Sequence, residues 1–236
     1  MSEFIYGKNP VREALNANKK IYKLYLTKNN QELIDLAKRK KVNYQIVTQE
    51  FLQKLVSGVH QGAVAEVDSY RYYSLEEILD TNKKYPLIVI LDGLEDPHNL
   101  GAILRICDAA GVDGIIIPKH RSVGLNHTVA KVSTGAIEYV KVAVVTNITQ
   151  TIKKLKDKGY WVVGSDAGEM SVDYSAVDYK IPIALIIGSE GKGISRLVLE
   201  NCDYVVRIPM YGHVNSLNAS VSCGILVYQI LEKRKE

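Results

Sequence analysis

The chain has 236 residues, of which 47% are hydrophobic and 24% charged, enough for one large domain or two small ones. Its longest apolar runs fall short of the roughly 18 residues of a membrane span, and MSEFIYGKNP lacks the basic and apolar regions of a signal peptide. The net charge of +4 is compatible with a polyanionic partner but does not identify one. We therefore expect a cytoplasmic protein without a membrane partner.

The cysteines and histidines give no sign of a metal centre. Cys107, Cys202 and Cys223 are odd in number and lie in apolar stretches, as expected of buried free thiols. The sequence contains no CxxC motif, and His98 has no second candidate ligand at helical or hairpin spacing. We expect no bound metal.

Residues 1–67 alternate short apolar runs with segments of helical pattern, from VREALNAN to GAVAEV. This alternation is typical of α/β domains, and we predict a small one over residues 1–67. The next stretch, residues 68–86, has aromatic and charged residues but few runs that resemble buried strands. We interpret it as a linker with a short helix.

From Leu87 onward, six runs are apolar enough to be buried on both faces, which is typical of a parallel sheet covered by helices. They are LIVILD, GIIIP, YVKVAVV, WVVGSD, IALIIGS and YVVRIP. Segments of helical pattern separate most of them, and a terminal helix follows the last. We predict a second α/β domain with a parallel sheet over residues 87–236.

Ligands of open parallel sheets bind beyond the carboxyl ends of the strands, so the residues after each strand are candidates for a site. The first such stretch is LDGLEDPHNLGAILR, where a helix is expected to begin near Asn99. Gly101 allows a backbone or ligand to approach closely, and Arg105 lies one turn further on. A structural interpretation, with Asn99 as a cap and Arg105 solvated, explains the segment equally well.

The second stretch, IIGSEGKGI, places glycines around Ser189, Glu190 and Lys192 between a strand and a helix. It does not match the GxxxxGK[ST] phosphate loop, because Lys192 is followed by glycine and the upstream spacing is wrong. The GxGxxG pattern of dinucleotide-binding folds is also missing. The remaining interpretation is a tight glycine turn whose amides can hold a polar ligand.

The third stretch, IPMYGHVNSLNASVSCG, leaves a strand and enters the terminal helix. Asn215 or Ser216 can cap this helix by accepting hydrogen bonds from its free amides. Small residues in its first turns allow a ligand or a partner subunit to lie close. Helical spacing predicts a buried face made of Leu217, Val221, Ile225 and Tyr228.

Together and in this order, NLGAILR, IIGSEGKGI and IPMYGHVNSLNASVS closely resemble the three signature motifs of the SpoU (TrmH) branch of the SPOUT RNA methyltransferases. The resemblance covers residues 87–233. Residues 1–67, with FIYGKNPVREAL and HQGAVAEV, resemble the ribosomal-protein-L30e-like substrate-binding domain of many members. The whole chain is most similar to the bacterial 23S rRNA guanosine 2'-O-methyltransferases of this family.

The resemblance implies a SPOUT fold that composition cannot show. In that fold the C-terminal segment threads through a loop to form a deep trefoil knot, a rare exception to the rule that connections do not thread. The resemblance further implies S-adenosylmethionine as cofactor, bound in the knot, and a homodimer that packs through knot-region helices.

The resemblance also implies roles for single residues. The implied catalytic residues are Arg105, Asn99, Glu190, Ser216 and Asn218. The implied cofactor contacts are Thr134, Gly188, Ile208, Ser216 and Leu217. Because arginine is normally always protonated, we expect Arg105 to clamp an RNA phosphate and polarise the ribose 2'-hydroxyl rather than act as a base.

RNA recognition is expected to come from the N-terminal domain. The candidates there are Lys8, Asn9, Arg12, His60 and Gln61, for each of which a structural role is equally possible. The favoured function is S-adenosylmethionine-dependent methylation of a ribose 2'-hydroxyl in 23S rRNA, at a guanosine. The alternatives are tRNA ribose methylation, an antibiotic-resistance rRNA methyltransferase, and a non-catalytic RNA-binding assembly factor, which the intact motif residues disfavour.

Overall fold

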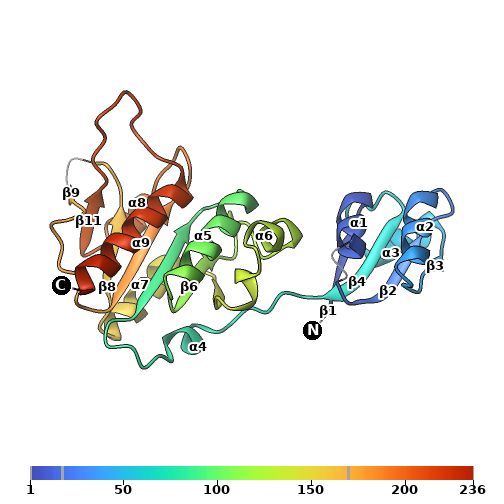
Figure 1. The fold of residues 1–236 in the computed structure, drawn as a ribbon, viewed down its shortest axis with the longest axis horizontal. Helices are drawn as coiled ribbons and strands as arrows, with labels where there is room; N and C mark the ends of the chain where they lie inside the picture. The colour runs from blue at the N-terminus through green and yellow to red at the C-terminus, as the bar shows by residue number, and fades with distance from the viewer. Residues whose placement is uncertain (1, 17–18, 169–170, 236) are drawn as a thin grey trace. The chain divides into compact units, whose positions relative to one another are not determined.

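The computed structural model describes residues 2–16, 19–168 and 171–235. The chain forms two compact units, residues 1–70 and residues 71–236, and each is described by itself (Figure 1). Within the described residues, no helix is both long and apolar enough to cross a membrane.

The first unit is a small four-stranded sheet with the strand order β1-β4-β2-β3. Strand β4 pairs antiparallel with β1 and β2, and β3 pairs parallel with β2. The core forms where Leu24 and Leu26 of β2 meet Val11 and Leu33 of the helices. The elements are β1 (Ser2–Tyr6), α1 (Lys8–Asn16), β2 (Ile21–Leu26), α2 (Gln31–Arg39), β3 (Gln45–Ile46), α3 (Gln49–Leu55) and β4 (Ala63–Asp68).

The predicted α/β character of this unit is confirmed, but strand β1 was not expected. None of its five residues is fully buried, and exposed and half-buried positions alternate along it. An edge strand of this kind lacks the apolar run by which the other strands are recognised.

The second unit contains a seven-stranded sheet in the order β7-β6-β5-β10-β8-β11-β9. Every pairing in it is parallel, as predicted, and the six expected runs all form strands. The strands are β5 (Leu87–Asp92), β6 (Gly114–Pro118), β7 (Val142–Val145), β8 (Trp161–Ser165), β9 (Val172–Asp173), β10 (Ile183–Gly188) and β11 (Tyr204–Arg207). The two-residue strand β9 is an edge strand that the sequence pattern did not reveal.

Helices cover both faces of this sheet. The helical elements are α4 (Leu75–Leu79), α5 (Pro97–Ala109), α6 (His127–Val132), the 3₁₀ helix η1 (Ala136–Glu138), α7 (Ile148–Asp157), α8 (Arg196–Leu199) and α9 (Ala219–Lys235). One core cluster joins Ile90 and Ile186 of the sheet to Ile152 of α7 and Val198 of α8. Helices α5 and α9 lie side by side on the other face (Figure 1).

The predicted free thiols are confirmed. Cys107 of α5 and Cys223 of α9 are buried, and Cys202 is half-buried. Burial raises the pKa of the Cys107 thiol well above its usual range, and the neighbouring Cys223 raises it further. Burial also raises the pKa of the Cys202 thiol to about 12. These thiols are therefore packing groups rather than reactive thiolates.

The stretch expected to be a linker contains the predicted short helix and packs on the sheet. Ser74 and Glu77 form a capping box at the start of α4. The Tyr73 amide donates to the Val142 carbonyl at 2.8 Å, and Ile78 is fully buried. Residues 71–86 therefore belong to the second unit.

Two expectations for the terminal helix are wrong. Val221 and Tyr228, predicted to be buried, are 48% and 52% exposed. The side chain that caps α9 is Asn218, whose Oδ1 accepts from the Ser220 amide at 2.9 Å. Because apolar residues occur on more than one side of this helix, spacing alone did not identify the buried side. The residues that it buries are Ala219, Cys223, Leu226, Val227 and Ile230.

Arg234 anchors the C-terminal end of α9 near the amino ends of β5 and β10. Its guanidinium donates hydrogen bonds to the carbonyls of Tyr179, Ile181 and Pro86. We predict that Arg234→Ala lowers the free energy of unfolding by about 2 kcal/mol, because hydrogen bonds from a charged donor are lost. Denaturant unfolding measures this change.

The matched control is Arg196→Ala, since Arg196 is exposed and, among the described residues, forms an ion pair with Glu200 alone. The control should change stability by less than about 0.5 kcal/mol. Equal losses in the two variants would mean that the Arg234 contacts do not anchor the helix.

Candidate functional site

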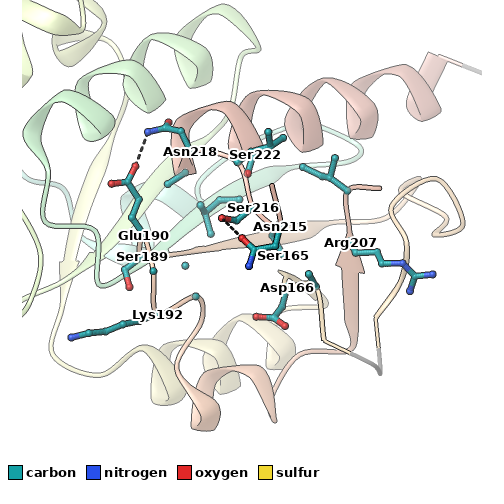
Figure 2. Close-up of a pocket in the computed structure, with 18 of the residues that line it drawn as sticks. Ser165, Asp166, Ser189, Glu190, Lys192, Arg207, Asn215, Ser216, Asn218 and Ser222 are labelled. Carbon is teal, nitrogen blue, oxygen red and sulfur yellow. Dashed lines mark hydrogen bonds between the residues drawn. The ribbon is translucent and has the colours of Figure 1, made fainter. Parts of the chain in front are cut away.

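A pocket of about 760 Å³ opens at the carboxyl ends of β8, β10 and β11. Strand β8 contributes Ser165 and is followed by Asp166, β10 leads into the Gly188–Gly193 loop, and β11 contributes Arg207 (Figure 2). The connection from β11 to α9 supplies the remaining wall, which includes Ser216, Leu217 and Asn218. The pocket thus lies where parallel sheets bind ligands.

The β10 loop has a closed geometry that explains its glycines. The amides of Ser189 and Gly193 each donate to the carbonyl of the other, at 3.1 and 3.0 Å. Gly191 and Gly193 have φ values of 78° and 65°, in the left-handed region that favours glycine. A Cβ atom at Gly188 would lie 2.2 Å from the Gly193 carbonyl carbon, so only glycine fits there. The loop therefore presents Glu190 in a fixed position.

Glu190 is held by two asparagines from distant parts of the chain. The Asn218 Nδ2 atom donates to Glu190 Oε1 at 2.6 Å and to Asn99 Oδ1 at 2.9 Å. Asn99 Nδ2 donates to the same carboxylate oxygen at 2.9 Å. Figure 2 shows Glu190 and Asn218 pointing toward each other at the edge of the pocket. We call Asn99, Glu190 and Asn218 the amide–carboxylate cluster.

Helix caps position both asparagines. Asp96 accepts from the His98 amide at 3.0 Å, and α5 begins at Pro97, so buried Asn99 lies in the first turn. Asn218 precedes α9 and caps it through Oδ1, which leaves Nδ2 for the cluster. The predicted loop-to-helix entry at Asn99 is thus confirmed, with the cap at Asp96.

The cluster leaves one acceptor for a ligand. Both asparagines bind Glu190 Oε1, while Oε2 accepts no hydrogen bond from any residue that the structure describes. A carboxylate oxygen accepts hydrogen bonds and cannot donate them when ionised. A ligand hydroxyl beside Glu190 can therefore be oriented by this free oxygen.

The structure brings together most of the predicted cofactor contacts. Gly188, Ile208, Ser216 and Leu217 all line the pocket. Thr134 does not: it lies between α6 and η1, with a φ of 50°.

Arg105 is also outside the pocket of its own chain. Its side chain is exposed and forms no hydrogen bond or ion pair with another described residue. Six residues separate it from Asn99 on α5, which puts the two on different faces of the helix.

The predicted RNA-binding residues lie in the first unit. The Lys8 amide donates to Gln61 Oε1 at 3.1 Å, and both residues line a pocket of about 340 Å³. Arg12 donates to Asn9 and, at 2.8 Å, to Glu32. His60 has a structural role: its ring is buried, and Nδ1 accepts a hydrogen bond from the Gly62 amide.

A second pocket, of about 560 Å³, lies beyond the carboxyl ends of β5, β6 and β10. Its lining includes Asn99 and Glu190 of the cluster, and also polar residues that the sequence did not single out. Besides Lys192 of the glycine turn, which also lines the pocket, those residues are Asp92, Glu95, Asp96, His120, Arg121 and Ser195. Their position directly after predicted strands was the only signal that could have identified them. Within the described parts of the chain, no group of His, Cys, Asp and Glu could hold a metal ion.

Sequence comparison agrees with this arrangement. The SpoU rRNA Methylase family matches residues 86–228, and a family described as "RNA 2'-O ribose methyltransferase substrate binding" matches residues 4–73. The chain is 47% identical, over 240 residues, to a TrmH family tRNA/rRNA methyltransferase of Bacillus subtilis, covering 98% of this chain and 96% of that protein. A homologue from Staphylococcus saprophyticus is also 47% identical, over 238 residues, covering 98% and 95%.

Solved structures give the same result. An AdoMet-bound rRNA methyltransferase of Sinorhizobium meliloti aligns with a TM-score of 0.66 and 25% identity, covering 98% of this chain and 87% of that one. A TrmH/SpoU tRNA-modifying enzyme of A. aeolicus aligns with a TM-score of 0.60 and 33% identity, covering 68% and 81%. Its three motifs meet at the amide–carboxylate cluster, and a family model matches most of its length. The chain therefore belongs to the SpoU (TrmH) family of RNA methyltransferases.

Proposed function

We propose that this protein transfers a methyl group from S-adenosylmethionine to the 2'-hydroxyl of a ribose in 23S rRNA, at a guanosine. The observation that carries the proposal is the amide–carboxylate cluster, which stands at the edge of the large pocket and offers the free Glu190 Oε2 atom to a hydroxyl. The family match supports ribose methylation of RNA; the choice of 23S rRNA and guanosine is the finer proposal.

The residues around the 760 Å³ pocket fit the cofactor. Its volume lies within the range of about 300–1,000 Å³ that is usual for small-molecule sites. S-adenosylmethionine carries a sulfonium and an ammonium, and the pocket wall carries the carboxylates of Asp166 and Glu190. Asp166 Oδ1 accepts from the Gly168 amide, and Oδ2 has no partner among the described residues. When bound, the cofactor supplies an electrophilic methyl group.

The protein's own part in the reaction is alignment and handling of a proton. A 2'-hydroxyl is a poor nucleophile, so it must be held in line with the methyl group and must lose its proton during transfer. We propose that Glu190 Oε2 orients the hydroxyl and accepts its proton as the oxygen takes the methyl group, while Asn99 and Asn218 fix the carboxylate. Ser216, which lines the same pocket, completes the catalytic set.

We propose that Arg105 binds an RNA phosphate and polarises the hydroxyl in the site of a second copy of the chain. Its side chain is exposed and lines neither pocket of its own chain, so it is free for such a role. Exposed Val221 and Tyr228 on α9 offer apolar surface for a homodimer through α5 and α9. The proposal includes the trefoil knot that the resemblance implies, in which the C-terminal segment threads through a loop.

Ribosomal RNA is favoured over tRNA because the rRNA methyltransferase of Sinorhizobium meliloti aligns over 98% of this chain, whereas the tRNA-modifying enzyme of A. aeolicus aligns over only 68%. The tRNA alternative is kept, since the Bacillus subtilis relative is named for both substrates.

The test incubates the protein with methyl-labelled S-adenosylmethionine and separate pools of unmodified 23S rRNA, 16S rRNA and tRNA. Label on a 23S guanosine ribose supports the proposal, and label confined to tRNA overturns the substrate. Cofactor binding without label on any RNA favours the assembly factor.

We predict that Arg105→Ala lowers kcat for RNA methylation by about a hundredfold, with the Kd for S-adenosylmethionine unchanged. The cause is loss of the group that polarises the hydroxyl. Single-turnover methylation and calorimetric cofactor titration measure the two quantities. Lys154→Ala, on exposed α7 surface, is the control and should keep wild-type rates. An undiminished rate in the Arg105→Ala variant would show that Arg105 takes no part in the reaction.

Mixing two inactive variants tests which subunit Arg105 serves. We predict that Arg105→Ala and Asn218→Ala proteins, unfolded and refolded together, regain part of the wild-type rate. A mixed dimer then holds one site with both Asn218 and the partner's arginine. No recovery, with mixed dimers demonstrated by differential tags, would place Arg105 in the site of its own chain.

We also predict that removing residues 1–70 raises the Kd for RNA by about tenfold or more. The loss of a single hydrogen bond to a charged group is enough for a change of that size. The removed unit has its own core, so residues 71–236 should retain cofactor affinity. Filter binding with labelled 23S fragments and cofactor titration report the two affinities. RNA affinity equal to that of the full chain would contradict this division of labour.

A further inference from the structure

We infer that the second pocket, of about 560 Å³, holds the target nucleotide of the RNA, with Arg121 and Lys192 binding a phosphate beside it. This inference rests on the proposed function, because it requires an RNA acceptor. It deepens that function by assigning a binding site to the acceptor strand, together with Arg121, which lies outside the signature motifs.

The pocket is built by loops that follow three neighbouring strands, β6, β5 and β10. These loops meet at Gly93, where an added Cβ atom would lie 3.7 Å from Ser189 Cβ and 3.8 Å from the Arg121 carbonyl oxygen. The Val123 amide donates to the Leu94 carbonyl at 2.8 Å and so joins the β6 loop to the β5 loop. The cavity is therefore a defined part of the fold.

The two pockets share one wall. Ser189, Glu190, Lys192 and Gly193 of the β10 loop line both of them. In the amide–carboxylate cluster, Asn218 lines the first pocket, Asn99 lines the second, and Glu190 lines both. A ligand in the second pocket can thus place a hydroxyl at Glu190 while the cofactor occupies the first. This is the relation that transfer between two substrates requires.

The charges of the second pocket fit a nucleotide. Arg121 and Lys192 form no hydrogen bond or ion pair with any residue that the structure describes, so both can bind an anion. Asp92 already accepts from the Ser195 amide at 2.7 Å, and Asp96 caps α5. Besides Glu190 of the cluster, Glu95 is the remaining carboxylate of the lining, and it can accept hydrogen bonds from the N–H groups of a base.

The backbone at Arg121 supports a role in binding. Its φ is 56°, in the left-handed region that residues other than glycine, asparagine and aspartate seldom adopt. Such conformations gather at binding and catalytic sites, where the surroundings hold them. The neighbouring His120 lines the same pocket, which makes the β6 loop a basic wall of the acceptor site. Phosphate contacts of this kind fix the position of a nucleic acid without reading its sequence.

The test uses Arg121→Gly in the full-length protein, because glycine adopts the left-handed backbone without strain and so preserves the loop. We expect the KM for RNA to rise by about tenfold to a hundredfold, as for a lost charged hydrogen bond. The slope of log Kd against log salt concentration should become shallower by about 0.7, the loss of one contact to a single strand. The Kd for S-adenosylmethionine should stay unchanged.

Two further variants make the result specific. Lys119→Ala removes a positive charge from the same loop, although Lys119 does not line the pocket. The substitution keeps the hydrogen bond that the Lys119 backbone amide donates to the Val145 carbonyl. This variant should retain the wild-type KM. Arg121→Lys keeps the positive charge and should recover part of the RNA affinity.

The outcomes separate this inference from the proposed function. If the wild type methylates RNA and Arg121→Gly does so with unchanged KM and salt dependence, the acceptor site is elsewhere and the inference fails alone. If Arg121→Gly loses cofactor affinity instead, the pocket belongs to the cofactor, and the inference also fails. If the wild type binds the cofactor but methylates no RNA, the proposed function fails, and the inference that rests on it fails with it.

Discussion

The reciprocal hydrogen bonds between Ser189 and Gly193 are the constraint on which the rest of the site depends. They close the loop after β10 into a rigid turn, and the absence of a side chain at Gly188 lets the backbone of that turn fold back on the strand. Glu190 stands at the tip of the turn, where two asparagines from elsewhere in the chain reach it. Without the closed turn, the carboxylate would lose its fixed place between the two pockets.

This constraint also explains how the helices contribute. Helices α5 and α9 pack against each other on one face of the sheet. The N-terminal end of each helix places one asparagine, Asn99 or Asn218, against the β10 loop. The buried contact between Cys107 and Cys223 lies in the same helix pair. The packing of two helices therefore sets the distance between groups that are 119 residues apart in the chain.

The sequence was informative where residue chemistry and spacing act locally. Runs such as LIVILD and IALIIGS predicted buried parallel strands, because only such strands are apolar on both faces. The glycines around Glu190 predicted a tight turn, and the family resemblance gathered Asn99, Glu190 and Asn218 into one site, as the structure shows. The resemblance, rather than spacing, supplied the long-range contacts.

What could not be predicted depends on tertiary packing. The buried side of α9 is chosen by the sheet and α5, and the spacing of Val221 and Tyr228 fits a buried face that does not form. Strand β1 exists because β4 offers an edge for it, although its own residues are not buried. Arg121 belongs to none of the three motifs, and its place in the pocket that Glu190 also lines follows from the strand order β6-β5-β10.

Asn218 carries two duties with one side chain, since its oxygen caps α9 and its nitrogen holds Glu190. An aspartate there would keep the cap but set a second carboxylate against the first, and a serine would keep the cap but lack the donor reach of an amide. A single substitution at Asn218 therefore alters both the start of α9 and the position of the Glu190 carboxylate.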